Sequence, residues 1–168
     1  MVTRLLCCVL IWYCAMSAAW AKDYQTTDWD ALMPPDWVPE FNEQEYAPDL
    51  SDEEDDAAWL SQFNSMPAPT VPELNNQPLR IPGYVLPVKY DGSKVYEFLL
   101  VPYVGACIHV PPPPANQMVY VILDQPLEAA QLWEPVWASG IMKTEIADTK
   151  LATAGYKMLK ATIERYEY

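Results

Sequence analysis

The sequence has 168 residues, of which 51% are hydrophobic and 20% charged, and its formal net charge at pH 7 is −13. A surface this negative repels polyanions, so the composition excludes a protein that binds nucleic acid or anionic lipid headgroups. The acidity is consistent either with basic partners or with a role limited to keeping the folded chain soluble.

The first residues have the three parts of a secretory signal. Arg4 supplies the positive charge, residues 5–16 form an uncharged apolar stretch, and Ala19-Trp20-Ala21 has the small-x-small pattern of a cleavage site. The apolar stretch is shorter than the about 20 residues that a membrane-spanning helix needs. We therefore expect cleavage after Ala21 and a periplasmic protein with no permanent membrane span, and an uncleaved anchor is the alternative.

The chain that follows this signal peptide (residues 1–21) changes composition once. Residues 22–78 form an arm rich in Trp, Pro and acids, whereas residues 79–168 carry the β-branched and apolar runs that strands favour. Capping patterns in the arm predict a helical turn after Asp28 and a helix over residues 51–63. The sequence thus predicts an acidic N-terminal arm followed by one β-rich domain.

The β-rich domain has the pattern of a small barrel. Asp91-Gly92 is a strong hairpin signal, Gly140 is placed where a strand must bend, and Pro126 is typical of a helix start. We expect a short helix over residues 126–134 and five strands, over residues 80–90, 94–101, 118–123, 136–146 and 155–166. Three strands, a helix and two more strands is the order of an OB-like, partly open five-stranded barrel.

The segment between the second and third predicted strands contains the candidate functional residues. Four consecutive prolines form a rigid polyproline II rod without backbone donors, so this segment lies on a surface or over a cleft. The candidates for a functional loop are Tyr103, Gly105, Pro111, Pro112, Pro113, Pro114, Asn116 and Gln117.

Cys107 and His109 lie in the same segment, and signal cleavage leaves Cys107 as the only cysteine. Two residues apart on an extended backbone, both side chains point to one face. Three interpretations are open: packing of a buried thiol and a hydrogen-bonded imidazole, a zinc or copper site, or a Cys-His nucleophile pair. The metal site needs further ligands, and the nucleophile pair has no visible third group to orient the imidazole.

Several short segments of the chain also form a recognisable pattern, and its Cys-x-His-Pro-rich segment is the most specific part. They are Trp29 with Leu32-Met33-Pro34, Arg80-Ile81-Pro82-Gly83-Tyr84-Val85, Leu100-Val101-Pro102-Tyr103, Gly105-Ala106-Cys107-Ile108-His109-Val110 with the four prolines, Asn116-Gln117, Pro135-Val136-Trp137 with Gly140, and Ala154-Gly155-Tyr156. This pattern resembles the exported bacterial family known as domain of unknown function 3299. The resemblance implies a periplasmic protein, often encoded beside ABC-type transporter components, some of them tied to zinc supply. It brings no catalytic residues.

These observations predict a non-catalytic periplasmic accessory or binding protein, linked to an ABC-type transport or zinc-homeostasis system. The expected partner is the periplasmic domain of a membrane transporter. Two alternatives stay open: a thiol- or metal-dependent enzyme that uses Cys107 and His109, and a protein-interaction module that uses the acidic arm or the proline run.

Overall fold

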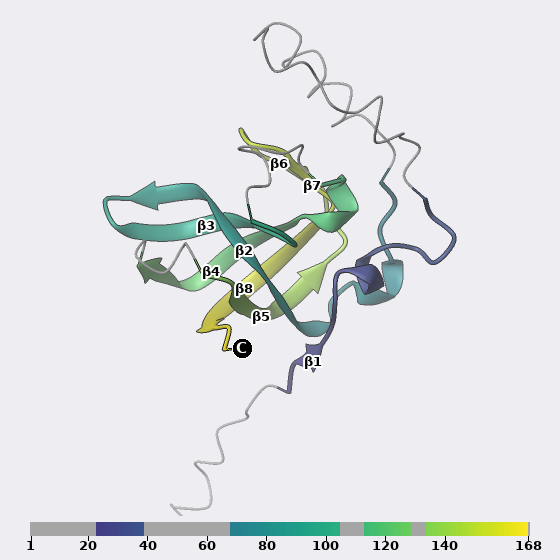
Figure 1. The fold of residues 1–168 in the computed structure, drawn as a ribbon, viewed down its shortest axis with the longest axis horizontal. Coiled ribbons are helices and arrows are strands. Elements are labelled where there is room, and N and C mark those ends of the chain that lie inside the picture. The colour runs from purple at the N-terminus through teal and green to yellow at the C-terminus, as the bar shows by residue number, and fades with distance from the viewer. Residues whose placement is uncertain (1–22, 39–67, 105–112, 129–133, 168) are drawn as a thin grey trace, which may run out of the picture.

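A five-stranded β-barrel dominates the computed structural model, which describes residues 23–38, 68–104, 113–128 and 134–167 (Figure 1). Its strands follow the order β2-β3-β4-β8-β5, and β5 pairs again with β2, which closes the barrel. Only the pairing of β4 with β8 is parallel among these five. The strands are β2 (Pro78–Asp91), β3 (Lys94–Val101), β4 (Val119–Glu128), β5 (Val136–Lys143) and β8 (Tyr156–Arg165). The predicted OB-like barrel is confirmed, although it is closed rather than partly open.

Short elements accompany the barrel. A two-residue strand, β1, pairs in parallel with the start of β2, and β6 and β7 form a small hairpin in the connection between β5 and β8. Within the described residues, no helix is long and apolar enough to cross a membrane. The short elements are β1 (Gln25–Thr26), η1 (Asp30–Leu32), η2 (Pro72–Leu74), η3 (Ala115–Gln117), β6 (Ala147–Asp148) and β7 (Thr153–Ala154).

Strand β2 serves two neighbours and changes partner at Gly83. Its residues 78–83 pair with β5, and its residues from Tyr84 onward pair with β3. A Cβ at Gly83 would lie 2.8 Å from the Val101 carbonyl oxygen and 3.0 Å from the Trp29 ring. Glycine is therefore required because backbone and ring approach too closely for any side chain.

The hairpin between β2 and β3 forms where the sequence predicts it. Gly92 has φ +56°, the left-handed conformation that glycine adopts without steric cost, and β3 begins at Lys94. Register shifts follow Pro87, because a proline within a strand cannot donate a ladder hydrogen bond and is accommodated at a bulge.

The predicted bend at Gly140 is also present. Ser139 pairs with Thr162 and Ile141 with Leu159, so two residues of β8 face Gly140 alone. A Cβ at Gly140 would lie 2.5 Å from Met158 Cγ, a distance that no side chain tolerates. This β-bulge lets the barrel turn tightly at the β5–β8 pair.

The predicted helix over residues 126–134 is wrong at its start. Pro126 and Glu128 belong to β4, and Leu127 pairs with Val95 of β3 while its side chain joins the core. Pairing and burial therefore override the local preference of Pro126 for a helix N-terminus. Residues 129–133 lie outside the described residues.

Apolar side chains fill the barrel interior, and the N-terminal segment adds to them. Leu32 is fully buried among the strand residues and Trp29 packs against the same cluster. The predicted turn after Asp28 forms as η1, with the amide of Ala31 donating to Asp28 Oδ1 at 3.0 Å. The signal peptide and the predicted helix over residues 51–63 lie outside the described residues.

Candidate functional site

The loop between β3 and η3 is described only at its two ends. Tyr103 and Val104, with 41% and 71% of their surface exposed, lead away from β3, whereas Pro113 is buried and Pro114 half-buried. The remaining candidates of this loop, Gly105, Cys107, His109, Pro111 and Pro112, lie outside the described residues.

Asn116 and Gln117, the last two loop candidates, are buried and bind the N-terminal segment. Gln117 Nε2 donates to the Trp29 carbonyl at 2.7 Å, and Asn116 Nδ2 donates to the Pro69 carbonyl at 3.1 Å. Both contacts join segments that are far apart in the sequence. These two side chains therefore attach the N-terminal segment to the barrel.

Tyr156, which sequence reasoning missed, completes this attachment. Its buried hydroxyl donates to the Leu32 carbonyl at 2.7 Å and accepts from the Val71 amide at 2.6 Å. Burial raises the pKa of the Tyr156 phenol, so the proton needed for the first bond is retained. We call residues 29–33 and 69–71, held in this way, the N-terminal plug. Figure 1 shows η1 and η2 beside each other at this side of the barrel.

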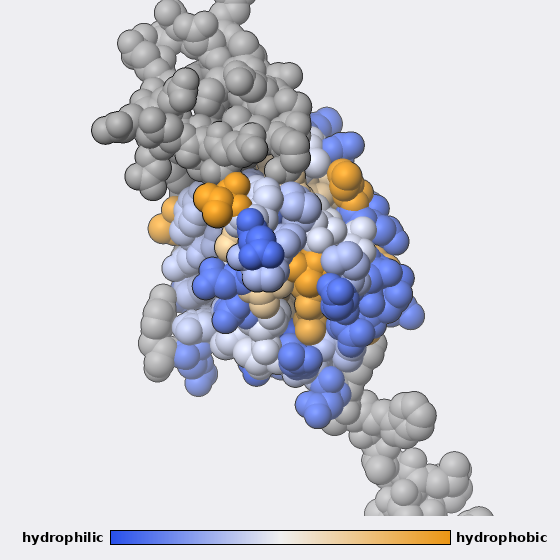
Figure 2. Space-filling model, turned by 90° about the vertical axis from the view of Figure 1, so that its right-hand side faces the viewer, coloured by the Kyte–Doolittle hydropathy of each residue, from blue (hydrophilic) through white to orange (hydrophobic). Residues whose placement is uncertain are grey.

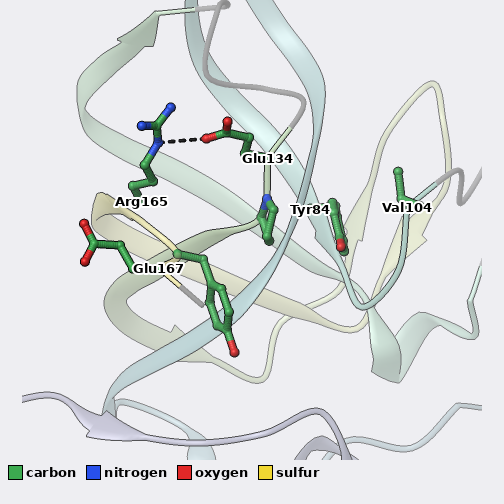
Figure 3. A pocket seen from close by; sticks show the side chains of 7 residues that line it. Tyr84, Val104, Glu134, Arg165 and Glu167 are labelled. Atoms are coloured by element: carbon green, nitrogen blue, oxygen red, sulfur yellow. Dashed lines mark ion pairs between the residues drawn. The ribbon is translucent and has the colours of Figure 1, made fainter.

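An open hollow of about 600 Å³ lies on the barrel near the point where β2 changes partner (Figure 3). Four separate segments supply its walls: the middle of β2, the residues after β3, the residues before β5 and the end of β8. We call it the rim hollow, and its lining residues are Tyr84, Val104, Glu134, Pro135, Arg165, Tyr166 and Glu167.

An ion pair borders the rim hollow on one side. Arg165 Nε lies 2.7 Å from Glu134 Oε2, and the two side chains are 69% and 56% exposed. In Figure 3 this pair and Glu167 lie on the left of the view, and Tyr84 and Val104 lie on the right. The hollow thus has a charged side and an aromatic and aliphatic side.

The aromatic ring of Tyr166 is held in place by its neighbours. It stacks on Trp137 with ring centres 5.1 Å apart, and the Arg80 guanidinium lies 4.5 Å from the centre of the Trp137 ring. Arg80 in turn pairs with Glu164 at 2.7 Å. This stack fixes one wall of the hollow on the outer surface of β2, β5 and β8.

A second polar cluster lies on the outer face of β2, β3 and β4. The Tyr120 hydroxyl donates to Glu97, and Lys89 pairs with the same carboxylate at 2.9 Å. The hydrogen bond from Tyr120, supported by Lys89, lowers the pKa of Glu97. Burial together with Glu97 raises the pKa of Tyr120 to about 12. The hydrogen bond between them explains the shift of the Glu97 pKa, whereas burial is the main cause of the Tyr120 shift and the bond to Glu97 adds to it, so the cluster has a structural explanation.

Metal-ligating side chains do not gather anywhere in the described part of the chain: no three His, Cys, Asp or Glu residues there could hold one ion. Cys107 and His109 are not among those residues, and zinc or copper binding by them stays a prediction.

Figure 2 shows that polar and charged residues cover most of one face, with small, separate hydrophobic patches.

Sequence reasoning did not find the residues of the rim hollow. Tyr84 and Glu134 lie at ordinary strand and loop positions, and nothing in their spacing marks them. The run Glu164-Arg165-Tyr166-Glu167 at the end of β8 is the one signal that was present, because three charged residues flank an aromatic residue there.

Comparison with known proteins identifies the relatives of this chain. No curated protein matches it. A crystal structure at 2.45 Å resolution of a DUF3299 family protein from Pseudomonas aeruginosa PAO1 is similar, with 37% sequence identity and a TM-score of 0.70. The match covers 87% of this chain and 98% of that one. The family described as "Protein of unknown function (DUF3299)" matches residues 29–165, and the chain belongs to this family.

Proposed function

We propose that the protein is a non-catalytic binding protein of the periplasm that serves a membrane transport system. The observation that carries the binding role is the rim hollow, where four segments bring two tyrosine rings, a proline, a valine and three charged groups to one open surface. Such a mixture of apolar contact area and a few charged groups is typical of recognition sites.

The filled barrel supports an external binding site. Side chains such as Phe98, Leu100 and Tyr156 are fully buried in one cluster that occupies the interior. A five-stranded barrel packed in this way has no lumen for a ligand. Binding therefore takes place on the outer surface, and the openness of the hollow favours a segment of another protein.

The compartment and the transport link have separate support. The secretory pattern that ends at Ala21 supports export, and the resemblance described above supports a transporter's periplasmic domain as the partner. A narrower role in zinc homeostasis rests on that resemblance and on Cys107 and His109.

Site-specific photo-crosslinking in the periplasm tests the binding role. Val104, 71% exposed on the rim hollow, is replaced by a photoreactive amino acid, and Ile146, 68% exposed outside the hollow, serves as the matched control. We expect a crosslink to a transporter's periplasmic domain from position 104 and little or none from position 146. Equal crosslinking from both positions, or none from position 104, would contradict the proposal.

The intact mass of the protein recovered from the periplasm tests the compartment. We expect a chain that begins at Lys22 and stays in the soluble fraction. A chain that still carries Met1, or one that remains with membranes at high salt, would contradict export with cleavage.

A further inference from the structure

The charge of the rim hollow points to the chemistry of its partner. Its lining holds two carboxylates, Glu134 and Glu167, and a single guanidinium, Arg165. Among the described residues, Glu167 has no ion-pair partner. The whole chain has a net charge of −13, so the long-range field also attracts cations. Charge complementarity at the hollow therefore favours a basic ligand.

The Arg165–Glu134 pair offers a carboxylate that a ligand can reach. Both side chains are more than half exposed, and an exposed ion pair contributes little free energy because water and salt compete with it. A cation that arrives with its partner can replace Arg165 at Glu134 at small cost. Arg165 would then be a competitor of the ligand and not its anchor.

The apolar side of the hollow suits the stem of a basic side chain. The rings of Tyr84 and Tyr166, together with Pro135, border the same space, and stacking on Trp137 fixes the Tyr166 ring. Lys and Arg bury their methylene groups on such surfaces, and their charged heads interact favourably with aromatic faces.

We infer that the rim hollow binds a basic, extended segment of a partner protein, with a Lys or Arg side chain that takes the place of Arg165 at Glu134. This inference rests on the proposed function and adds the charge class of the partner segment. It assigns Glu134 and Glu167 to recognition, and it makes Arg165 a group that weakens binding.

Fluorescence anisotropy with two labelled peptides tests the inference on the mature protein. One peptide is built from Arg, Pro and Ala, and its match has Glu in place of every Arg. We expect the basic peptide to bind, with an affinity that falls as salt is raised. Arg165→Ala should tighten binding about threefold, since it removes the competing cation. Glu134→Gln with Glu167→Gln should weaken binding by about tenfold or more.

Lys157→Ala is the matched control, because it breaks a comparable exposed ion pair, Lys157–Glu145, outside the hollow. It should leave affinity for the basic peptide unchanged, apart from the uniform effect of one lost charge. Three results would overturn the inference. They are tighter binding of the acidic peptide than of the basic one, weaker binding of the basic peptide by Arg165→Ala than by the wild type, and no binding of either peptide at about 1 mM. If one of these peptide results occurs but position 104 still crosslinks to a transporter's periplasmic domain, only the inference fails and the proposed function stands. If the crosslink is absent as well, both the inference and the proposed function fail.

Discussion

The N-terminal plug and the rim hollow differ in the exposure of their polar groups to solvent. In the plug, the Tyr156 hydroxyl is buried and bonds two segments, and Gln117 binds a backbone carbonyl away from water. In the hollow, the Arg165–Glu134 pair lies in solvent. Buried hydrogen bonds are costly to break because each leaves a group without a partner, whereas exposed pairs exchange readily with water or a ligand. The hydrogen bonds of the plug therefore contribute to stability, whereas the ion pair at the hollow can exchange its partners at small cost.

Truncation of Leu32 should give the largest difference in stability between a variant of the plug and a variant of the rim hollow. Leu32→Ala removes a fully buried side chain from the core, which should lower the free energy of unfolding by about 3 kcal/mol through lost burial and the cavity left behind. Urea unfolding followed by circular dichroism measures the change. Val104→Ala, at an exposed position, should change stability by no more than about 0.5 kcal/mol. Equal losses in the two variants would contradict the distinction.

Removal of the Tyr156 hydroxyl should have the next largest effect. Tyr156→Phe deprives the Leu32 carbonyl and the Val71 amide of their partner while it keeps the ring in place. We expect a loss of about 1–3 kcal/mol, the cost of leaving buried groups unpaired. Tyr90→Phe, on a side chain that is 66% exposed, is the control and should be neutral. Full stability of Tyr156→Phe would show that the plug is held by packing alone.

Alkaline pH should reveal the tyrosines that the fold keeps protonated. The pKa of Tyr120 is raised from 10.0 to about 12, so above pH 10 the unfolded chain loses this proton before the folded one does. The stability that this shift contributes is complete below pH 10 and declines as pH rises towards 12. Tyr120→Phe should therefore give a shallower alkaline loss of stability in urea titrations. An unchanged slope would show that the Tyr120–Glu97 bond does not couple protonation to folding.

The smallest effect on the fold is expected at Cys107 and His109, whose metal-site hypothesis is still open. Calorimetric titration of the mature protein with zinc or copper should show modest binding, lost in both Cys107→Ser and His109→Ala, and weakened by acid because protons compete for both ligands. If the wild type shows no saturable binding, the alternative is packing, in which Cys107→Ser costs stability and His109→Ala costs little.

Local signals in the sequence were sufficient to predict much of the barrel. Gly92 and Gly140 mark positions that need a left-handed turn or a close approach, so the hairpin and the bulge were predictable from single residues. Pro126 misled because a proline before an amphipathic run favours a helix start, and pairing of Leu127 with Val95 reverses that preference. Such long-range pairing leaves no local mark.

The plug and the rim hollow show why the rest could not be predicted. The plug depends on Gln117 meeting Trp29 and on Tyr156 meeting Leu32, contacts between residues 88 and 124 positions apart. The rim hollow needs Tyr84, Glu134 and Arg165 to meet from three strands or their ends. Only closure of the barrel brings these residues together. The candidates chosen from the sequence, Cys107 and the prolines, lie in one continuous segment. A sequence motif is visible only when its residues are close together along the chain.

Amide hydrogen exchange of the mature protein, alone and with the partner captured at position 104, tests most directly whether the hollow is the binding surface. Slowed exchange should appear around Tyr84, Glu134 and residues 165–167, and exchange in the buried, hydrogen-bonded plug around Leu32 should not change. Protection that appears at the plug or over β6 and β7, with none at the hollow, would contradict the account.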